Sequence, residues 1–357
     1  MANLTALDNN IKARILQAVI LAPSADNSQP WCYSWQDNTL FISRDAALSG
    51  QATDSTFVLT DLAVGCAIEN AVLAARQLGL DTSCQLFPQG EAALLSASLT
   101  FSQSDDVADD YAIALAEQIE KRCTDRRLPF SGTLSQQTQQ ALLNSVNSAA
   151  VTVQCFTQRD KISALANIIK SAEAIRFKSE MLHQELFSSV NFVDDKPTQG
   201  MTAAMLGIEA PARPFFRVIS KWSNMKKFNV IGAAAMVAMR SVSLPLRLSP
   251  ALAVITTSGT GRPAIIDAGR QLQRFWLAAT LHGLSVHPYA APGVLTLVNP
   301  ALDSPLNQQL AAVKQQLQEN FGAAEQVVMF FRLGYKAGQP VRSLRRSVVE
   351  LACKDTK

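Results

Sequence analysis

The stretch LAARQLGL, residues 73–80, returns later in the chain as LAATLHGL, residues 277–284, with Leu, Ala, Ala, Gly and Leu in matching places. The match has no gap, and it extends from the pair Gly65 and Gly269 to the pair Pro88 and Pro292. Self-similarity of this kind predicts two related structural units in one chain.

Each copy predicts a long amphipathic helix, because the glycine that follows its last turn, Gly79 or Gly283, is a common helix C-terminus. Strand-like runs surround both helices. They stand at 31–45 (a hairpin that turns near Asp37), 93–101, 251–259 and 327–335. Since each half mixes strands and helices, the sequence predicts an α+β fold of two tandem halves, at 8–104 and 118–350.

The overall composition limits the class of protein. The chain has 357 residues, of which 48% are hydrophobic and 17% charged, and such a chain folds around a substantial core. Its net charge of +3, without a long basic stripe, does not predict nucleic-acid binding. Three histidines are too few for a histidine-rich centre, and we expect no metal.

The cysteines and the N-terminus predict a compartment. Six cysteines are scattered without a C-x-x-C pair, which favours reduced thiols over a disulfide framework or a zinc site. The first residues, MANLTALDNNIKARI, lack the apolar core of a signal peptide. Both features predict a cytoplasmic protein.

The second half carries extra sequence at 190–248, which is rich in Pro, Met, Gly and basic residues. Such insertions more often form a lid or an interface arm than a separate domain. The most apolar part, FNVIGAAAMVAM (228–239), is shorter than the ~20 residues that a helix needs to cross a bilayer. We therefore expect a buried or lid-like helix there and no membrane partner.

The segment APSADNSQPW, residues 22–31, follows a predicted helix and has Asp26 as its only charge. It can be a helix-ending turn capped by Ser and Asn, which is common for these residues. It can also be a ligand loop, in which Ser24 and Asn27 offer a hydroxyl and an amide while prolines such as Pro23 stiffen the backbone.

The segment RCTDRR, residues 122–127, is a candidate anion site. Arg122, Thr124 and Arg126 alternate, so in an extended segment their side chains project to one side. Two guanidinium groups around a hydroxyl suit a phosphate, because arginine offers forked, charge-assisted donors. The alternative is a solvated basic linker.

A second basic segment, RSLRR (342–346), follows the last predicted strand, and Arg345 can meet the first cluster if both lie in the same half. Dinucleotide and phosphate-loop signatures, G-x-S-x-G and H-E-x-x-H do not occur. No acid–base pair or nucleophile triad can be assembled either. A polar, non-ionisable loop together with arginines fits a protein that binds a ready-made reactive cofactor.

Together these segments resemble the FMN-dependent nitroreductase family. APSADNSQPW is similar to the family's A-P-S-x-x-N-x-Q-P-W signature, and RCTDRR to its N-terminal R-x-[ST]-x-[RK] phosphate-binding segment. RLGYKAGQPVRSLRRSV resembles the closing stretch of the family, and LAATLHGLSVHPY its central helix and the loop after it. The resemblance covers about 11–348, apart from the insertion.

The order of these segments departs from that of ordinary family members. In those short chains the basic segment precedes the A-P-S loop, and FMN lies at the interface of a homodimer. Here the first half has the loop without the basic segment, and the second half has the basic segment and tail without the loop. The chain therefore resembles the long, Acg-like branch, which implies a nitroreductase-like α/β sandwich and an internal pseudo-dimer that binds one FMN as a monomer or weak homodimer.

The resemblance also implies which residues bind the cofactor. The loop would edge the flavin ring, the arginines would hold the phosphate, and the loop after the second repeat helix would line the ring. No side chain would be catalytic, since the flavin carries the chemistry. The implied cofactor-binding residues are Pro23, Ser24, Asn27, Arg122, Thr124, Arg126, Pro288, Tyr289, Ala290 and Arg345.

Two functions follow from the resemblance. In the first, NADH or NADPH reduces FMN, which then reduces a small-molecule acceptor such as a nitroaromatic or a quinone. In the second, the protein stores or sequesters flavin without catalysis, because the insertion at 190–248 covers the ring with Met201, Met205, Phe215 and Phe216. A third possibility is a scaffold whose arginines bind another phosphorylated metabolite.

Overall fold

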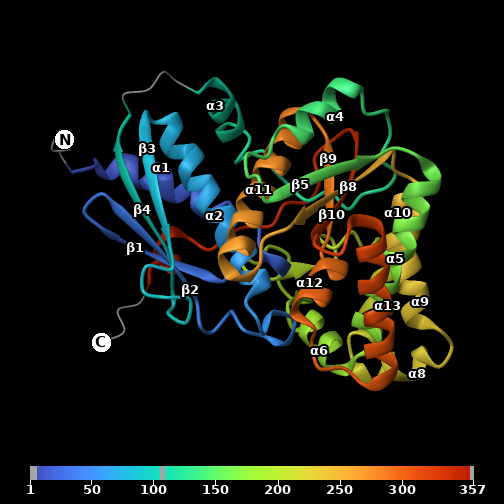
Figure 1. The fold of residues 1–357 in the computed structure, drawn as a ribbon. Helices are drawn as coiled ribbons and strands as arrows, with labels where there is room; N and C mark the ends of the chain where they lie inside the picture. The colour runs from blue at the N-terminus through green and yellow to red at the C-terminus, as the bar shows by residue number, and fades with distance from the viewer. Residues whose placement is uncertain (1–5, 105–108, 354–357) are drawn as a thin grey trace.

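The computed structural model describes residues 6–104 and 109–353. Two four-stranded antiparallel sheets lie on either side of a central pair of long helices (Figure 1). The first sheet has the order β1-β2-β4-β3, and the second the order β5-β8-β10-β9. The strands are β1 (Trp31–Gln36), β2 (Thr39–Arg44), β3 (Leu80–Leu86), β4 (Leu95–Gln103), β5 (Val151–Phe156), β8 (Ala251–Thr257), β9 (Ser285–Tyr289) and β10 (Gln326–Gly334).

The two sheets share one connection pattern. When the four strands of each sheet are counted along the chain, they lie side by side in the order first, second, fourth, third. In each sheet a long helix joins the second strand to the third. These helices are α2 (Val58–Gln77) and α11 (Gly261–Leu281), which contain the repeated sequence. The helices, the hairpin turn at Asp37 and the strands predicted from the sequence are therefore confirmed, while the boundaries 8–104 and 118–350 stay predictions.

The central helices meet at two glycines of the repeat. A Cβ on Gly65 would lie 2.2 Å from the carbonyl oxygen of Ile266, and a Cβ on Gly269 would lie 2.3 Å from that of Leu62. The two contacts mirror each other, because the repeat aligns Gly65 with Gly269 and Leu62 with Ile266. Only glycine allows the two backbones to approach this closely.

Buried polar pairs continue this mirrored contact. Glu69 accepts a hydrogen bond of 2.9 Å from Arg274, and Asn70 accepts one of 2.7 Å from Gln273. Arg270 adds a second ion pair to Glu69, at 3.0 Å. Because these groups are paired, the charged and amide side chains can be buried between the halves.

Apolar side chains form three clusters. The largest lies between the two sheets and includes α2, α11 and α1 (Asn9–Ile20). The second lies between the other face of the second sheet and the helices α5, α12 and α13, and the third belongs largely to the insertion. The remaining helices are α3 (Asp110–Ala116), α4 (Gln136–Leu143), α5 (Arg159–Lys178), α6 (Glu180–Ser188), α7 (Arg213–Ile219), α8 (Trp222–Asn229), α9 (Ala233–Ala238), α10 (Leu244–Arg247), α12 (Ala291–Val298), α13 (Ser304–Phe321) and α14 (Val348–Leu351).

The insertion at 190–248 lies between β5 and β8 in the chain. It contains the short parallel strands β6 (Val190–Asn191) and β7 (Met201–Thr202), followed by α7 to α10. Within the described part of the chain, α2 is the one unbroken helix long and apolar enough to span a membrane, and 89% of its apolar window is buried.

Candidate functional site

Three segments that are far apart in the sequence meet beside α1. The loop 22–31 contacts the tail 342–346, and Leu21, the residue just before the loop, contacts the basic segment 122–127. Arg122 donates to the carbonyl oxygen of Leu21 at 3.2 Å, and Arg345 donates to the amide oxygen of Asn27 at 2.7 Å. The loop comes from the first half of the chain and both basic segments come from the second, so the candidate site lies at the junction of the two halves.

The loop has an unusual backbone. Asp26, Asn27 and Gln29 have φ values of 50°, 57° and 51°, in the left-handed region that non-glycine residues rarely adopt. The Ser24 hydroxyl oxygen stabilises this conformation by accepting the N–H of Gln29 at 2.9 Å. Trp31 and Gln29 are fully buried beneath it. The surroundings thus hold the loop in one conformation, as is common at functional sites.

Asn27 joins the loop to both of its neighbours. Its amide nitrogen donates to the carbonyl oxygens of Thr198, Gly200 and Leu344, at 3.1–3.3 Å, while its oxygen accepts from Arg345. Protein groups therefore use the whole side-chain amide. The role of Asn27 as a flavin contact stays a prediction, and in the structure it links loop, insertion and tail.

Replacing Asn27 by glycine should lower the free energy of unfolding by about 2–3 kcal/mol, because buried carbonyl groups and the Arg345 guanidinium lose their partner. Glycine adopts the left-handed φ without strain, so the loss reports the hydrogen bonds. The measurement is chemical denaturation of the full chain. Asn299→Gly is the matched control, since Asn299 also has a positive φ, of 48°, and is exposed. Equal losses in both variants would contradict the assignment.

The basic segment runs beside β9. Thr124 forms a parallel bridge to Val286, and the N–H of Asp125 donates to the Val286 carbonyl at 2.8 Å. Asp125 and Arg127 bind each other through two hydrogen bonds, of 2.9 and 2.7 Å. This pair is separate from Arg122, which donates to Leu21, and from Arg126, which donates to Met205.

Positive charge gathers around Arg122 and Arg345. Arg122 is buried, and its guanidinium stacks 4.6 Å from the centre of the Trp276 ring. Burial lowers the pKa of Arg122 to about 10; burial and the nearby Arg122 charge lower the pKa of Arg345 to about 9. Arg342 adds a third positive charge and donates to the Arg122 carbonyl at 3.3 Å.

These guanidinium groups are not neutralised by protein. Among the described residues, no carboxylate forms a salt bridge with Arg122 or Arg345, and the Nε atoms of both are buried without a hydrogen-bond partner. Buried charges in proteins are normally paired. The arrangement therefore fits an anion with several acceptor oxygens, and a phosphate ester is such a group.

Arg126 lies toward the insertion instead of contacting this cluster. It donates to the carbonyl oxygen of Met205 at 2.9 Å, and the sulfur of Met201 is 4.0 Å from its Nη2. Burial lowers the pKa of Arg126, and the Asp26 carboxylate opposes this effect. The structure thus brings Arg122, Arg345 and Asn27 together and places Arg126 in a separate contact.

The predicted ring-lining residues end β9. Tyr289 is buried and its hydroxyl donates to the carbonyl oxygen of Ser241 at 3.2 Å; burial raises its pKa. Pro288 and Ala290 beside it are half-buried. His287, which no sequence motif singled out, also lies here, and its ring centre is 4.5 Å from that of Tyr289. Burial, with Arg126 and Arg332 nearby, lowers the pKa of His287 well below its usual value, so the ring is neutral at pH 7.

The first part of the insertion covers the loop. Gln29 donates to Thr198 at 2.8 Å, and Gln199 donates to the carbonyl of Ser28 at 3.1 Å. Met201 and Met205 lie beside Arg126, and their role in covering a flavin stays a prediction. Phe215 and Phe216 contact other rings instead: Phe215 packs on Phe228, and Phe216 packs on Phe187 and Phe192.

The end of the chain is tied to the first half. The Tyr33 hydroxyl donates to the carbonyl of Val348 at 3.0 Å, and Cys32 forms a disulfide with Cys353. The expectation of reduced thiols was wrong for this pair. Their separation of 321 residues hides the contact from the sequence, because only the folded tail brings Cys353 alongside β1.

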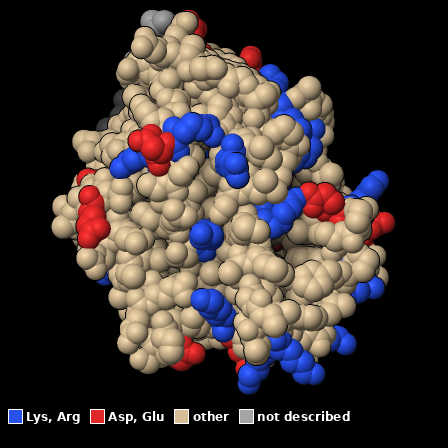
Figure 2. Space-filling model, turned by 90° about the vertical axis from the view of Figure 1, so that its right-hand side faces the viewer, with Lys and Arg blue, Asp and Glu red and all other residues tan. Residues whose placement is uncertain are grey.

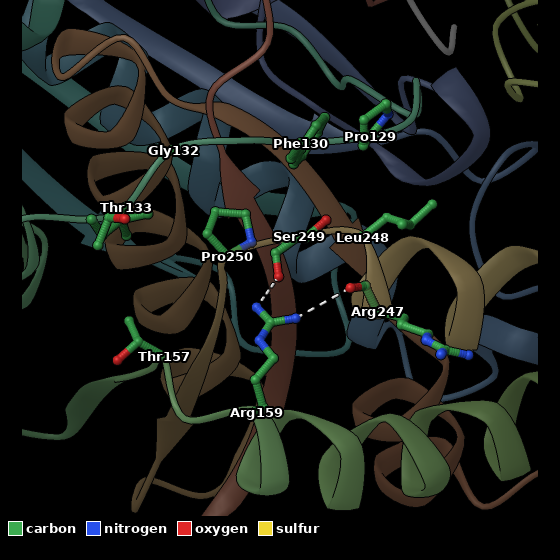
Figure 3. A pocket seen from close by; sticks show the side chains of 11 residues that line it. Pro129, Phe130, Gly132, Thr133, Thr157, Arg159, Arg247, Leu248, Ser249 and Pro250 are labelled. Atoms are coloured by element: carbon green, nitrogen blue, oxygen red, sulfur yellow. Dashed lines mark hydrogen bonds between the residues drawn. The ribbon is translucent and has the colours of Figure 1, made fainter.

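A cavity of about 480 Å³ next to α10 provides a contrast (Figure 3). Arg159 lines this cavity, but its guanidinium donates to the carbonyl oxygens of Arg247 and Ser249. These bonds hold the end of α10. This arginine is satisfied by backbone, so the cavity lacks the unpaired donors found around Arg345.

Comparison with known proteins gives distant relatives. No family model matches the chain. The uncharacterized protein MT1398 of Mycobacterium tuberculosis is 26% identical over 344 residues, which are 93% of this chain and 47% of that protein. The "Putative NAD(P)H nitroreductase acg" of the same species is 29% identical over 185 residues, or 51% of this chain and 55% of acg. The chain spans about half the length of the curated relatives it matches.

The solved structures that match this chain include two nitroreductases. One is the FMN-dependent nitroreductase NfnB from Mycobacterium smegmatis in complex with NADPH, with 16% identity, a TM-score of 0.39 and coverage of 68% of this chain and 98% of that one. The other is a nitroreductase with bound FMN from Bacteroides fragilis, with 14% identity, a TM-score of 0.38 and coverage of 65% and 94%. The chain is thus distantly related to acg, a protein named as a putative nitroreductase, and its own sheets and helices form an α+β fold.

Proposed function

We propose that this chain binds one FMN at the junction of its two halves. The observation that carries the proposal is the pair of Arg122, which is buried, and Arg345, which is half-buried. The Nε atoms of both are buried without a hydrogen-bond partner, and no described carboxylate neutralises either guanidinium. Arg345 contacts Asn27 of the loop that resembles a flavin-binding signature, and Arg122 contacts Leu21, the residue just before that loop. A phosphate there would receive charge-assisted hydrogen bonds from groups that are already in place.

The other proposed cofactor-binding residues are assigned from their positions in the same three segments. Thr124 belongs to the same segment as Arg122 and would complete the phosphate side, while Arg126, which donates to Met205, would border the cofactor beside the insertion. Pro23, Ser24 and Asn27 would border the ring from the first half. Pro288, Tyr289 and Ala290 would border it from the second half. The bound flavin would supply the hydride chemistry, and the protein would position it and control its access to water.

We further propose that the halves form an internal pseudo-dimer. The equal strand orders of the two sheets and the mirrored contacts of Gly65 with Ile266 and Gly269 with Leu62 support this. An apparent twofold relation would produce two sites if the halves were identical. The second half has no counterpart of the loop, because β5 begins at Val151, soon after α4 ends at Leu143. One site per chain follows.

For the activity, we propose an NAD(P)H-dependent oxidoreductase of the nitroreductase or quinone-reductase type. The name of the related acg supports this class. The alternative is flavin storage, and it has its own support. Thr198, Gly200 and Met205 of the insertion bind the loop and Arg126 directly, so this segment would restrict access to the ring.

Anaerobic stopped-flow spectroscopy separates the two activities. The FMN-loaded protein is mixed with excess NADPH or NADH while the flavin absorbance is followed. Rapid bleaching with either nucleotide is the result expected of an oxidoreductase. Bleaching by dithionite alone would contradict the reductase and favour storage. A protein that purifies and titrates without FMN would contradict both.

A further inference from the structure

The second part of the insertion is strongly basic. Residues 210–250 contain seven basic residues and no Asp or Glu. The whole chain has a net charge of only +3, so the rest of it is net negative. The basic residues are Arg213, Arg217, Lys221, Lys226, Lys227, Arg240 and Arg247.

The same segment exposes large apolar side chains. Helix α8 and the helical run Ala233–Arg247 meet at a bend of 95°. At this corner Val230 is 87% exposed and Ile231 is 74% exposed. Met236 and Met239, on the next turns, are more than half exposed. Single exposed apolar residues are ordinary, but a consecutive pair at a corner with two methionines beside it forms a patch.

The inner side of these helices is already in use. Met225, Ala233 and Ala234 are buried in a cluster with Phe177 and Phe187. The corner therefore cannot turn inward to hide its outer side chains. The structure leaves an apolar tip whose neighbours Lys226 and Lys227 are exposed and make no ion pair with any residue that the structure describes.

We propose that this corner docks on an anionic lipid bilayer. Lys and Arg run down the middle of the face to which α8, α9 and α10 contribute (Figure 2, the right-hand side of Figure 1). Basic residues are attracted to anionic headgroups, and aliphatic side chains between them enter the headgroup and acyl boundary. The apolar tip favours a lipid surface over a nucleic acid as the partner, because Val230 and Ile231 have no aromatic ring on which a base could stack.

In this proposal the corner binds at the membrane surface, and its helices do not span the bilayer. The apolar stretch 228–239 is shorter than the ~20 residues that a helix needs to cross a bilayer. Helix α8 and the helical run Ala233–Arg247 are together long and apolar enough, but the bend of 95° between them does not suit a straight span. Insertion of the corner by about 5–10 Å, which is typical of interfacial helices, accommodates Val230 and Ile231. This replaces the sequence-based expectation that the protein has no membrane partner, and it is independent of the proposed flavin site.

Co-sedimentation of the full chain with vesicles tests the proposal. One vesicle preparation is phosphatidylcholine alone, and the other is an equimolar mixture of phosphatidylcholine and phosphatidylglycerol. We expect binding to the mixed vesicles that weakens as salt is added. Lys226→Ala with Lys227→Ala should lower the partition coefficient about 30-fold, from the usual contribution of a basic residue near an anionic surface. Val230→Asp with Ile231→Asp should abolish binding.

Matched variants change the same residue types elsewhere. Lys314→Ala with Arg14→Ala removes two exposed basic residues, and Val349→Asp adds a carboxylate at a residue that is 84% exposed. Both should bind vesicles like the original protein, and thermal unfolding verifies that every variant is folded. Equal binding to neutral and anionic vesicles would overturn the proposal. So would a corner variant that binds normally, or self-association through the corner in sedimentation velocity without vesicle binding.

Discussion

Replacing both Arg122 and Arg345 by alanine should weaken FMN binding by about 4 kcal/mol, or about a thousandfold in Kd, because each contributes charge-assisted hydrogen bonds. The FMN-free variant should remain folded, since removing two close positive charges relieves repulsion that offsets the lost packing on Trp276. Titration of the apoprotein with FMN, followed by flavin fluorescence, gives the Kd, and thermal unfolding without FMN gives the stability.

Arg127→Ala is the matched control for this pair. It lies in the same basic segment, but its guanidinium binds Asp125 and the carbonyl oxygens of Ala337 and Gly338. We expect this variant to lose some stability and to keep its affinity for FMN. An unchanged Kd in the double variant, or an equal loss in the control, would show that the phosphate is bound elsewhere.

Replacing Gly65 by alanine should lower the free energy of unfolding by about 3 kcal/mol, since the new methyl group overlaps the carbonyl oxygen of Ile266. The sign of this change in the free energy of unfolding shows whether the new methyl group is obstructed. In an unobstructed helix interior, alanine is more favourable than glycine by about 1 kcal/mol. Gly269→Ala should cost a similar amount, because its methyl group meets the Leu62 carbonyl in the mirrored way.

The control for the glycine variants is Ala312→Val on the exposed side of α13, which adds bulk to a helix where nothing obstructs it. Its cost should stay within about 0.7 kcal/mol, the range of helix propensities. Chemical denaturation of the three variants provides the comparison. A gain of stability in Gly65→Ala would mean that the central helices do not approach as described.

The repeated helices and the strands around them could be predicted from the sequence because their signals are local. The periodicity of 73–80 and 277–284, the glycine that ends each helix and the alternation in 327–335 depend only on near neighbours. The meeting of Asn27 with Arg345 was accessible only through resemblance to a family, because 318 residues separate the two.

Other features depended on long-range placement that no local pattern encodes. The alternation in 122–127 predicted that Arg122 and Arg126 would project to one side of an extended segment, yet Arg126 donates to Met205 of the insertion, which packs against it. His287 carried no signal beyond its place after a repeat helix. The disulfide of Cys32 and Cys353 arises because the tail returns to β1, and scattered cysteines predicted the opposite.

The number of FMN molecules bound per chain shows whether the two halves build a single site. Native mass spectrometry of the full chain, saturated with FMN, measures this number. We expect one FMN per chain, which is lost when Arg122 and Arg345 of the second half are replaced. Two FMN molecules per chain, or one that persists in that variant, would contradict a single site built from both halves.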